Sequence, residues 1–120
     1  VAAALATIEV LEQEQPYQRM FYLGQKLMNG LKKSAQKNGL PLMVQGPGPM
    51  FHTGFTHSTE VKDFRDTFSY DKVKLSKFIA AMHNNNIRII GRGLWYISAA
   101  HTEEDIDHAI LVAEKVLSTI

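Results

Sequence analysis

Cysteine is absent from the 120-residue chain, which excludes disulfide bonds, thiolate metal sites and thiol nucleophiles. An excess of charge of either sign is also lacking. The formal net charge is +1, and neither a basic stripe nor an aromatic RNA-binding motif is visible, so we expect no nucleic-acid partner. No apolar run approaches the ~18 residues that cross a bilayer, and no signal peptide is recognisable. We therefore expect no membrane partner and a cytoplasmic protein.

The length and composition are those of one globular domain, with 45% hydrophobic and 21% charged residues. Apolar residues at helical spacing predict four helices. Alternating or short apolar runs bounded by glycine, proline and asparagine predict four strands. The helices are expected over residues 2–14, 17–37 and 71–84, and after Thr102. Asp71 and Thr102 are expected to cap the last two of these helices, and Asp105 follows Thr102 at the third helical position. The strands are expected over 40–45, 50–56, 87–90 and 94–97. Residues 63–70 are ambiguous, and a short helix is one interpretation.

This order of elements indicates an α+β fold, in which a small, mostly antiparallel sheet of about four short strands carries helices on one face. The last two strands are separated by Gly91-Arg92-Gly93, which is typical of a short hairpin connection. The first helix begins without a capping residue, since Val1 and three alanines open the chain. We interpret it as a helix whose beginning and packing partner are missing.

Several candidate chemical sites can be set aside from the sequence. Ser98 and His101 could be a nucleophile and its base, but no nucleophile elbow surrounds them. His101, Asp105 and His108 lack a fourth ligand at suitable spacing, so we expect no metal site. The turn at residues 46–49 contains two prolines, which remove the N–H donors that a phosphate loop needs. We expect His101 to be a corner residue that bonds nearby backbone.

Arg92 is the strongest candidate for ligand binding. An arginine between two glycines at a hairpin tip projects from the backbone, and its guanidinium suits bidentate binding of a carboxylate. The alternative is a solvated charge at a loop tip, because an accessible position does not by itself establish a role.

Three motifs together resemble a known family. They are the stretch Ser-Ala-Ala-His-Thr-Glu-Glu-Asp-Ile-Asp at residues 98–107, the alanine-rich helix at residues 2–11, and Gly-Pro-Met-Phe at residues 48–51. In this order they are similar to the C-terminal part of class III aminotransferases, which depend on pyridoxal phosphate, and especially to glutamate-1-semialdehyde aminomutases. Pro49 departs from the family's Gly-Ser-Met-Phe turn. The resemblance covers essentially the whole chain, but only the final part of the family's usual polypeptide.

The resemblance implies that residues 1–15 form an inter-domain helix and residues 16–120 the small C-terminal domain of a fold-type I aminotransferase. It implies amino-group transfer on an amino or keto substrate in an intact, homodimeric enzyme. This domain would close over the cleft, with Arg92 as a substrate contact. None of the lysines lies in a stretch like the family's cofactor-lysine motif, so no catalytic or cofactor-binding residue is expected, and the chain alone is expected to be inactive. The alternative is a freestanding α+β interaction module without catalysis.

Overall fold

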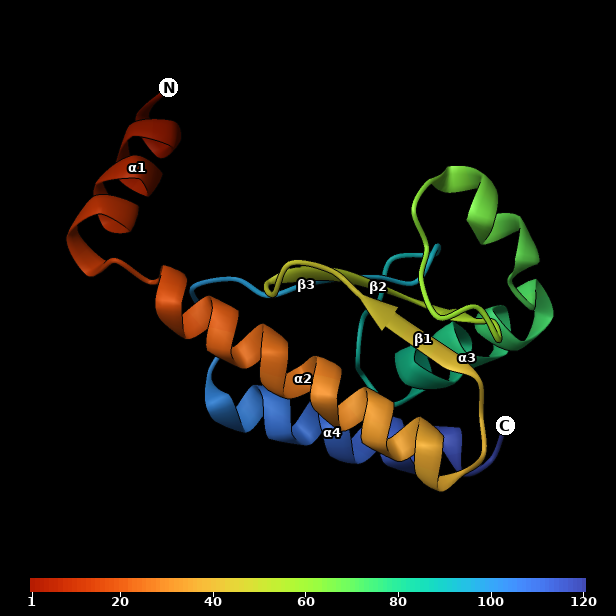
Figure 1. Cartoon of the computed structure of the whole chain (residues 1–120). Helices are drawn as coiled ribbons and strands as arrows, with labels where there is room; N and C mark the ends of the chain where they lie inside the picture. Colours follow the sequence, from red (N-terminus) through yellow and green to blue (C-terminus); the bar gives the residue numbers. More distant parts are fainter.

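The computed structural model describes residues 1–120 and is built around three antiparallel strands (Figure 1). The α+β class predicted from the sequence is confirmed. In chain order the elements are α1 (Ala2–Glu14), α2 (Tyr17–Lys37), β1 (Leu42–Gln45), β2 (Met50–Phe55), the 3-10 helix η1 (Phe64–Ser69), α3 (Lys72–Asn84), β3 (Leu94–Tyr96) and α4 (Glu103–Leu117).

The sheet has the order β1-β2-β3, with Val44 opposite Thr53 and Phe51 opposite Trp95. The expectation of about four strands was wrong by one, because residues 87–90 form no strand and only Ile90 makes an isolated bridge to Leu94. The backbone of this segment bonds elsewhere. Ile87 donates to the carbonyl of Met82, and Ile89 donates to Nε2 of His83 at 3.1 Å. The end of α3 therefore takes the hydrogen bonds that a fourth strand would need.

One face of the sheet, the closed face, is covered by helices: α2 and α3 contact the strands, and α4 packs against both of these helices. β2 contributes Phe51 and Phe55 to this closed face, and Phe51 stacks on Trp95 with ring centroids 5.6 Å apart. Phe78 of α3 meets Phe55 edge to face at 5.9 Å. Buried apolar side chains at helical spacing complete the core from α2 and α4: Leu23, Leu27, Leu31, Ile106, Ala113 and Leu117.

The predicted cap of the last helix is confirmed. The hydroxyl of Thr102 accepts from the N–H of Asp105, whose carboxylate accepts from the N–H of Thr102 at 2.8 Å. From α2, Arg19 donates to the carbonyls of His101, at 2.6 Å, and Ala99. The loop that enters α4 is thereby tied to the beginning of α2.

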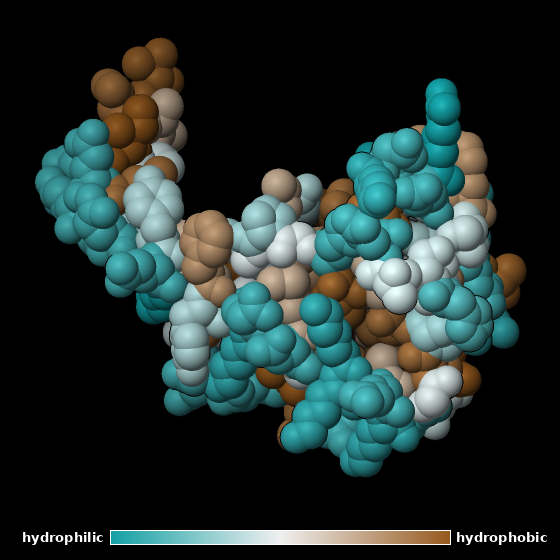
Figure 2. All heavy atoms as spheres, viewed as in Figure 1, coloured by the Kyte–Doolittle hydropathy of each residue, from teal (hydrophilic) through white to brown (hydrophobic).

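α1 stands apart from the rest of the molecule. It has no buried residue, and Leu5 is 63% exposed. Figures 1 and 2 show it projecting from the start of α2 with apolar side chains gathered on it. The change of direction falls at Gln15, which has a left-handed φ of 47°, and Pro16, which cannot continue the hydrogen-bond ladder of α1. None of the helices combines the length and apolar character that crossing a membrane requires.

The second face of the sheet is only partly covered, by residues 56–70. Gln45 binds the backbone of Val61 in both directions, donating to its carbonyl at 2.7 Å and accepting from its N–H at 3.0 Å. The ring of Tyr70 lies so close over Gly54 that a Cβ there would be 2.1 Å from it. The ambiguous segment is thus a 3-10 helix, capped by Asp63, which returns the chain across the sheet.

Candidate functional site

The turn that carries Arg92 is fixed on β2. The N–H of Gly93 donates to the carbonyl of Ile90 at 2.8 Å, and the carbonyl of Gly93 accepts from the N–H of Thr53 at 2.9 Å. Gly93 has a φ of 81°, and a Cβ there would lie 2.3 Å from the carbonyl oxygen of Thr53, so this position requires glycine. Arg92 is exposed beside it and makes no hydrogen bond or ion pair with the rest of the chain. Its guanidinium is available to a ligand.

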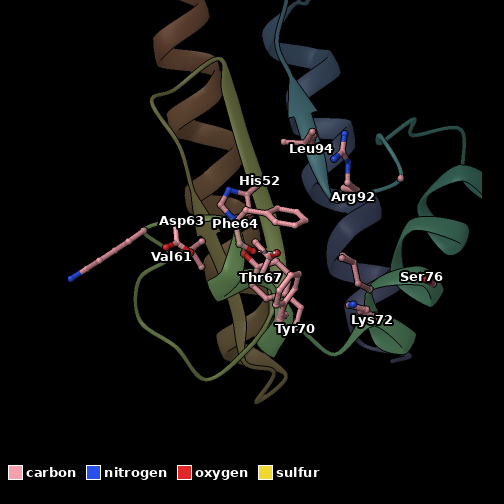
Figure 3. A pocket seen from close by; sticks show the side chains of 14 residues that line it. His52, Val61, Asp63, Phe64, Thr67, Tyr70, Lys72, Ser76, Arg92 and Leu94 are labelled. Carbon is pink, nitrogen blue, oxygen red and sulfur yellow. Dashed lines mark hydrogen bonds between the residues drawn. The ribbon is translucent and has the colours of Figure 1, made fainter.

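Arg92 borders a cavity of about 780 Å³ on the partly covered face of the sheet (Figure 3). His52 and Leu94 come from opposed positions on β2 and β3. The opposite wall comes from the segment before α3, and α3 itself closes one end. The lining side chains from these two regions are Val61, Lys62, Asp63, Phe64, Thr67, Phe68, Tyr70, Lys72, Leu75 and Ser76. The volume lies within the range of small-molecule sites, roughly 300–1,000 Å³.

A histidine–tyrosine pair lines the inner part of the cavity. Nε2 of His52 and the hydroxyl of Tyr70 are hydrogen-bonded at 2.7 Å, and the two rings stack with centroids 6.2 Å apart. Burial lowers the pKa of His52, partly offset by a backbone hydrogen bond to Gln45. Burial, together with the charge of Asp66, raises the pKa of Tyr70 to about 12. Both groups are therefore neutral at pH 7 and can exchange hydrogen bonds without carrying charge.

Two exposed aromatic rings form the rim. Phe64 and Phe68 are 66% and 62% exposed, and they meet edge to face with centroids 5.3 Å apart. Nζ of Lys72 lies 5.8 Å from the centre of the Phe68 ring. Asp63, the one carboxylate that borders the cavity, accepts the N–H groups of Arg65 and Asp66 as the cap of η1.

His101 is the corner residue that the sequence suggested. Its Nδ1 accepts the backbone N–H of Ser98 at 2.8 Å and lies 3.1 Å from the Ser98 hydroxyl. Neither side chain lines the cavity. No group of three or more His, Asp or Glu side chains is placed to hold a metal ion.

The sequence predicted the position of Arg92 at a tight turn, but it did not predict the cavity. In the sequence, His52 is only one of the alternating residues of a predicted strand, and Tyr70 lies 18 positions later. The one local signal was the pair Phe64 and Phe68, two large aromatic side chains in a short polar segment. That they line the same cavity as Arg92 depends on the sheet register and on the return of residues 56–70.

No protein-family model matches the chain. It is 33% identical over its whole length to a glutamate-1-semialdehyde 2,1-aminomutase of Desulfitobacterium hafniense, of which it spans only 28%. Among solved structures, it resembles a transaminase with PLP bound, with a TM-score of 0.77, 22% identity and coverage of 96% of this chain and 26% of that one. A glutamate-1-semialdehyde aminomutase from Pseudomonas aeruginosa superposes with a TM-score of 0.74 and 16% identity, covering 84% of this chain and 22% of the other. The chain thus spans about a quarter of the length of the relatives that it matches.

Proposed function

We propose that this chain, which matches the C-terminal portion of class III aminotransferases and aminomutases, closes over the active-site cleft of such an enzyme and helps to select the substrate. The observation that carries the proposal is the agreement of the two comparisons: the sequence match runs the length of the chain, and the fold match covers 96% of it. Nothing in the comparisons favours a freestanding interaction module. The activity proposed for the intact enzyme is amino-group transfer with pyridoxal phosphate, on an amino or keto acid.

We propose that the lysines and carboxylates of this chain do not hold the cofactor itself. Pyridoxal phosphate needs a lysine for a Schiff base and an acidic partner for its pyridine nitrogen. Of the lysines, Lys26 is held by Glu103 and Asp107, each at 2.7 Å, and Lys37 by Glu114 at 2.6 Å. Lys62 and Lys72 border the cavity, but the only carboxylate there caps η1. We therefore propose that another part of the intact enzyme holds the cofactor, and that this chain alone is inactive.

The contribution of this chain is to bind, orient and shield the substrate. A domain that closes over a cleft excludes water and fixes the reacting group, and a charged side chain on a rigid turn orients a carboxylate. Arg92 meets this description, since it is unpartnered and its turn is pinned to β2. We propose it as a substrate-carboxylate contact.

Further features suit a place within a larger enzyme. The exposed apolar face of α1 fits a helix that packs between domains, with residues 16–120 as the small domain. We propose that the intact enzyme is a cytoplasmic homodimer.

The proposal is tested by comparing the 120-residue chain with a longer polypeptide that includes the sequence encoded upstream of it. We expect the longer protein to convert the cofactor between its pyridoxal and pyridoxamine forms with an amino donor, followed by absorbance. We expect the chain alone to form no stoichiometric, borohydride-trappable adduct with pyridoxal phosphate. Turnover by the chain alone, or inactivity of the longer protein with all amino donors, would contradict the proposal.

The role of Arg92 is tested in the longer protein. Arg92→Ala should raise the apparent KM for a carboxylate substrate roughly 10- to 100-fold, the effect of losing charge-assisted hydrogen bonds. Arg92→Lys should recover part of this loss, because it keeps the charge but not the bidentate geometry. Arg65→Ala is the matched control, because this arginine does not border the cavity. An unchanged KM in Arg92→Ala would remove Arg92 from the site.

A further inference from the structure

The rim of the cavity presents apolar area that the fold does not use. Phe64 and Phe68 contribute nothing to the buried core, yet they are held against each other on a capped 3-10 helix. Two large aromatic side chains exposed together are unusual on a folded surface and are typical of a binding site. The edge-to-face arrangement leaves ring area to stack on a third ring.

Positive charge outnumbers negative charge around the same cavity, with three cationic side chains against one carboxylate. Arg92 and Lys72 have no ion-pair partner, and Lys62 has only the exposed Glu60 at 3.7 Å. The single bordering carboxylate, Asp63, is occupied by two backbone N–H groups. A ligand in this cavity therefore meets unpaired positive charge, which favours an anion over a cation or a neutral molecule.

The inner wall adds neutral hydrogen-bonding groups and more apolar area. His52 and Tyr70 satisfy each other at 2.7 Å, so neither demands a charged partner. Leu75 and Leu94 border the same space. A cavity of about 780 Å³ is too large to be filled by a short-chain acid and is of the size that encloses a ring system.

We propose that this cavity binds carboxylates that carry a bulky aromatic group, with the carboxylate on Arg92 and the ring against Phe64 and Phe68. For the intact enzyme this implies a substrate class, aromatic amino or keto acids rather than short-chain ones. That implication rests on the proposed function. As a statement about binding, the proposal concerns this chain alone, because every residue that it invokes lies between positions 52 and 94.

The test is a binding titration of the 120-residue chain, followed by changes in backbone amide NMR signals. The probes are indole-3-propanoate, which has both ring and carboxylate; glutarate, which has carboxylates without a ring; and tryptamine, which has the ring with a positive charge. We expect indole-3-propanoate to bind at least 10-fold more tightly than either other probe, with the largest changes at the amides of Phe64, Thr67 and Arg92. Equal binding of all three, or changes confined to other regions, would overturn the proposal.

Variants of the protein test the carboxylate contact and the ring contact separately. Arg92→Ala should weaken indole-3-propanoate binding roughly tenfold and should not weaken tryptamine binding, because a positive charge that repels tryptamine is removed. Phe64→Ala combined with Phe68→Ala should weaken it by a similar factor, and both rings are exposed, so the fold should be retained. Leu111→Ala is the matched control for losing an exposed apolar side chain, because Leu111 is 67% exposed on α4, outside the cavity. Unchanged affinity in either cavity variant would contradict the assignment.

The outcome is distinguishable from that of the proposed function. If the longer protein transfers amino groups but this chain does not bind indole-3-propanoate, the inference about the cavity fails and the function stands. If binding occurs but the longer protein transfers no amino group, the function fails and the cavity remains a site for aromatic carboxylates.

Discussion

The two faces of the sheet are built from alternate residues of the same strands, but they differ in what covers them. On the closed face, Phe51, Phe55 and Trp95 belong to the buried core that α2, α3 and α4 complete. On the second, partly covered face, which we call the open face, His52 and Leu94 line the cavity, and Met50 and Tyr96 are exposed. Because strand residues point alternately to the two faces, one short strand supplies both a core and a binding surface. We expect stability to depend on the first face and ligand binding on the second.

The largest loss of stability is expected from a substitution on the closed face. Phe78 is fully buried between Phe55 and Trp95, so Phe78→Ala should lower the free energy of unfolding by about 3–5 kcal/mol, the cost of a large core cavity. Urea denaturation followed by circular dichroism measures this change. A loss below ~1 kcal/mol would show that the core is not where the fold is stabilised.

A smaller effect is expected where the open face is covered. Gly54→Ala places a Cβ 2.1 Å from the ring of Tyr70, which must move away, at a cost of about 1–3 kcal/mol. The displaced phenol should regain contact with water, so its pKa should fall from about 12 toward the ordinary value of 10.0. An ultraviolet pH titration measures this shift, and an unchanged pKa in Gly54→Ala would contradict the close packing of the two residues.

A pH dependence should also arise on the open face. The pKa of His52 is lowered in the folded state from its usual 6.5, so between these two values the unfolded chain binds more protons. The contribution of His52 to stability is therefore complete above pH 6.5 and is lost as the pH falls from 6.5 through the folded pKa. His52→Gln should flatten the slope of unfolding free energy against pH in this window. An identical slope in both proteins would argue against a buried neutral imidazole.

The smallest effect on stability should come from the cavity rim. Phe68→Ala removes a ring that is already 62% exposed, so the free energy of unfolding should change by no more than ~0.5 kcal/mol. Thermal unfolding monitored by circular dichroism checks this. A loss comparable to that of Phe78→Ala would remove the distinction between a stabilising face and a binding face.

Elements with local signals could be predicted from the sequence, whereas elements with distant partners could not. Asp71 and Thr102 cap the helices that they were expected to cap, because a cap depends on residues two or three positions away. Residues 87–90 have the composition of a strand, but their backbone bonds to His83 and Met82 instead. In the cavity, the position of Arg92 at a tight turn was predictable. The hydrogen bond between His52 and Tyr70 was not, because it depends on the path of the chain between them. The role of Arg92 stays a prediction.

The pairing of α2 with α4 has a consequence for how the protein is made. The apolar face of α2 is complete once residue 37 has been synthesised, but the helix that covers it begins 66 residues later, at Glu103. At the usual pace of translation, about 5–20 residues per second, Leu27 and Leu31 wait several seconds for α4. A ribosome-bound intermediate that stops before Glu103 should therefore bind chaperones and be cleaved by proteases. Once α4 has been synthesised and packs on α2, these side chains should be buried and both effects should cease.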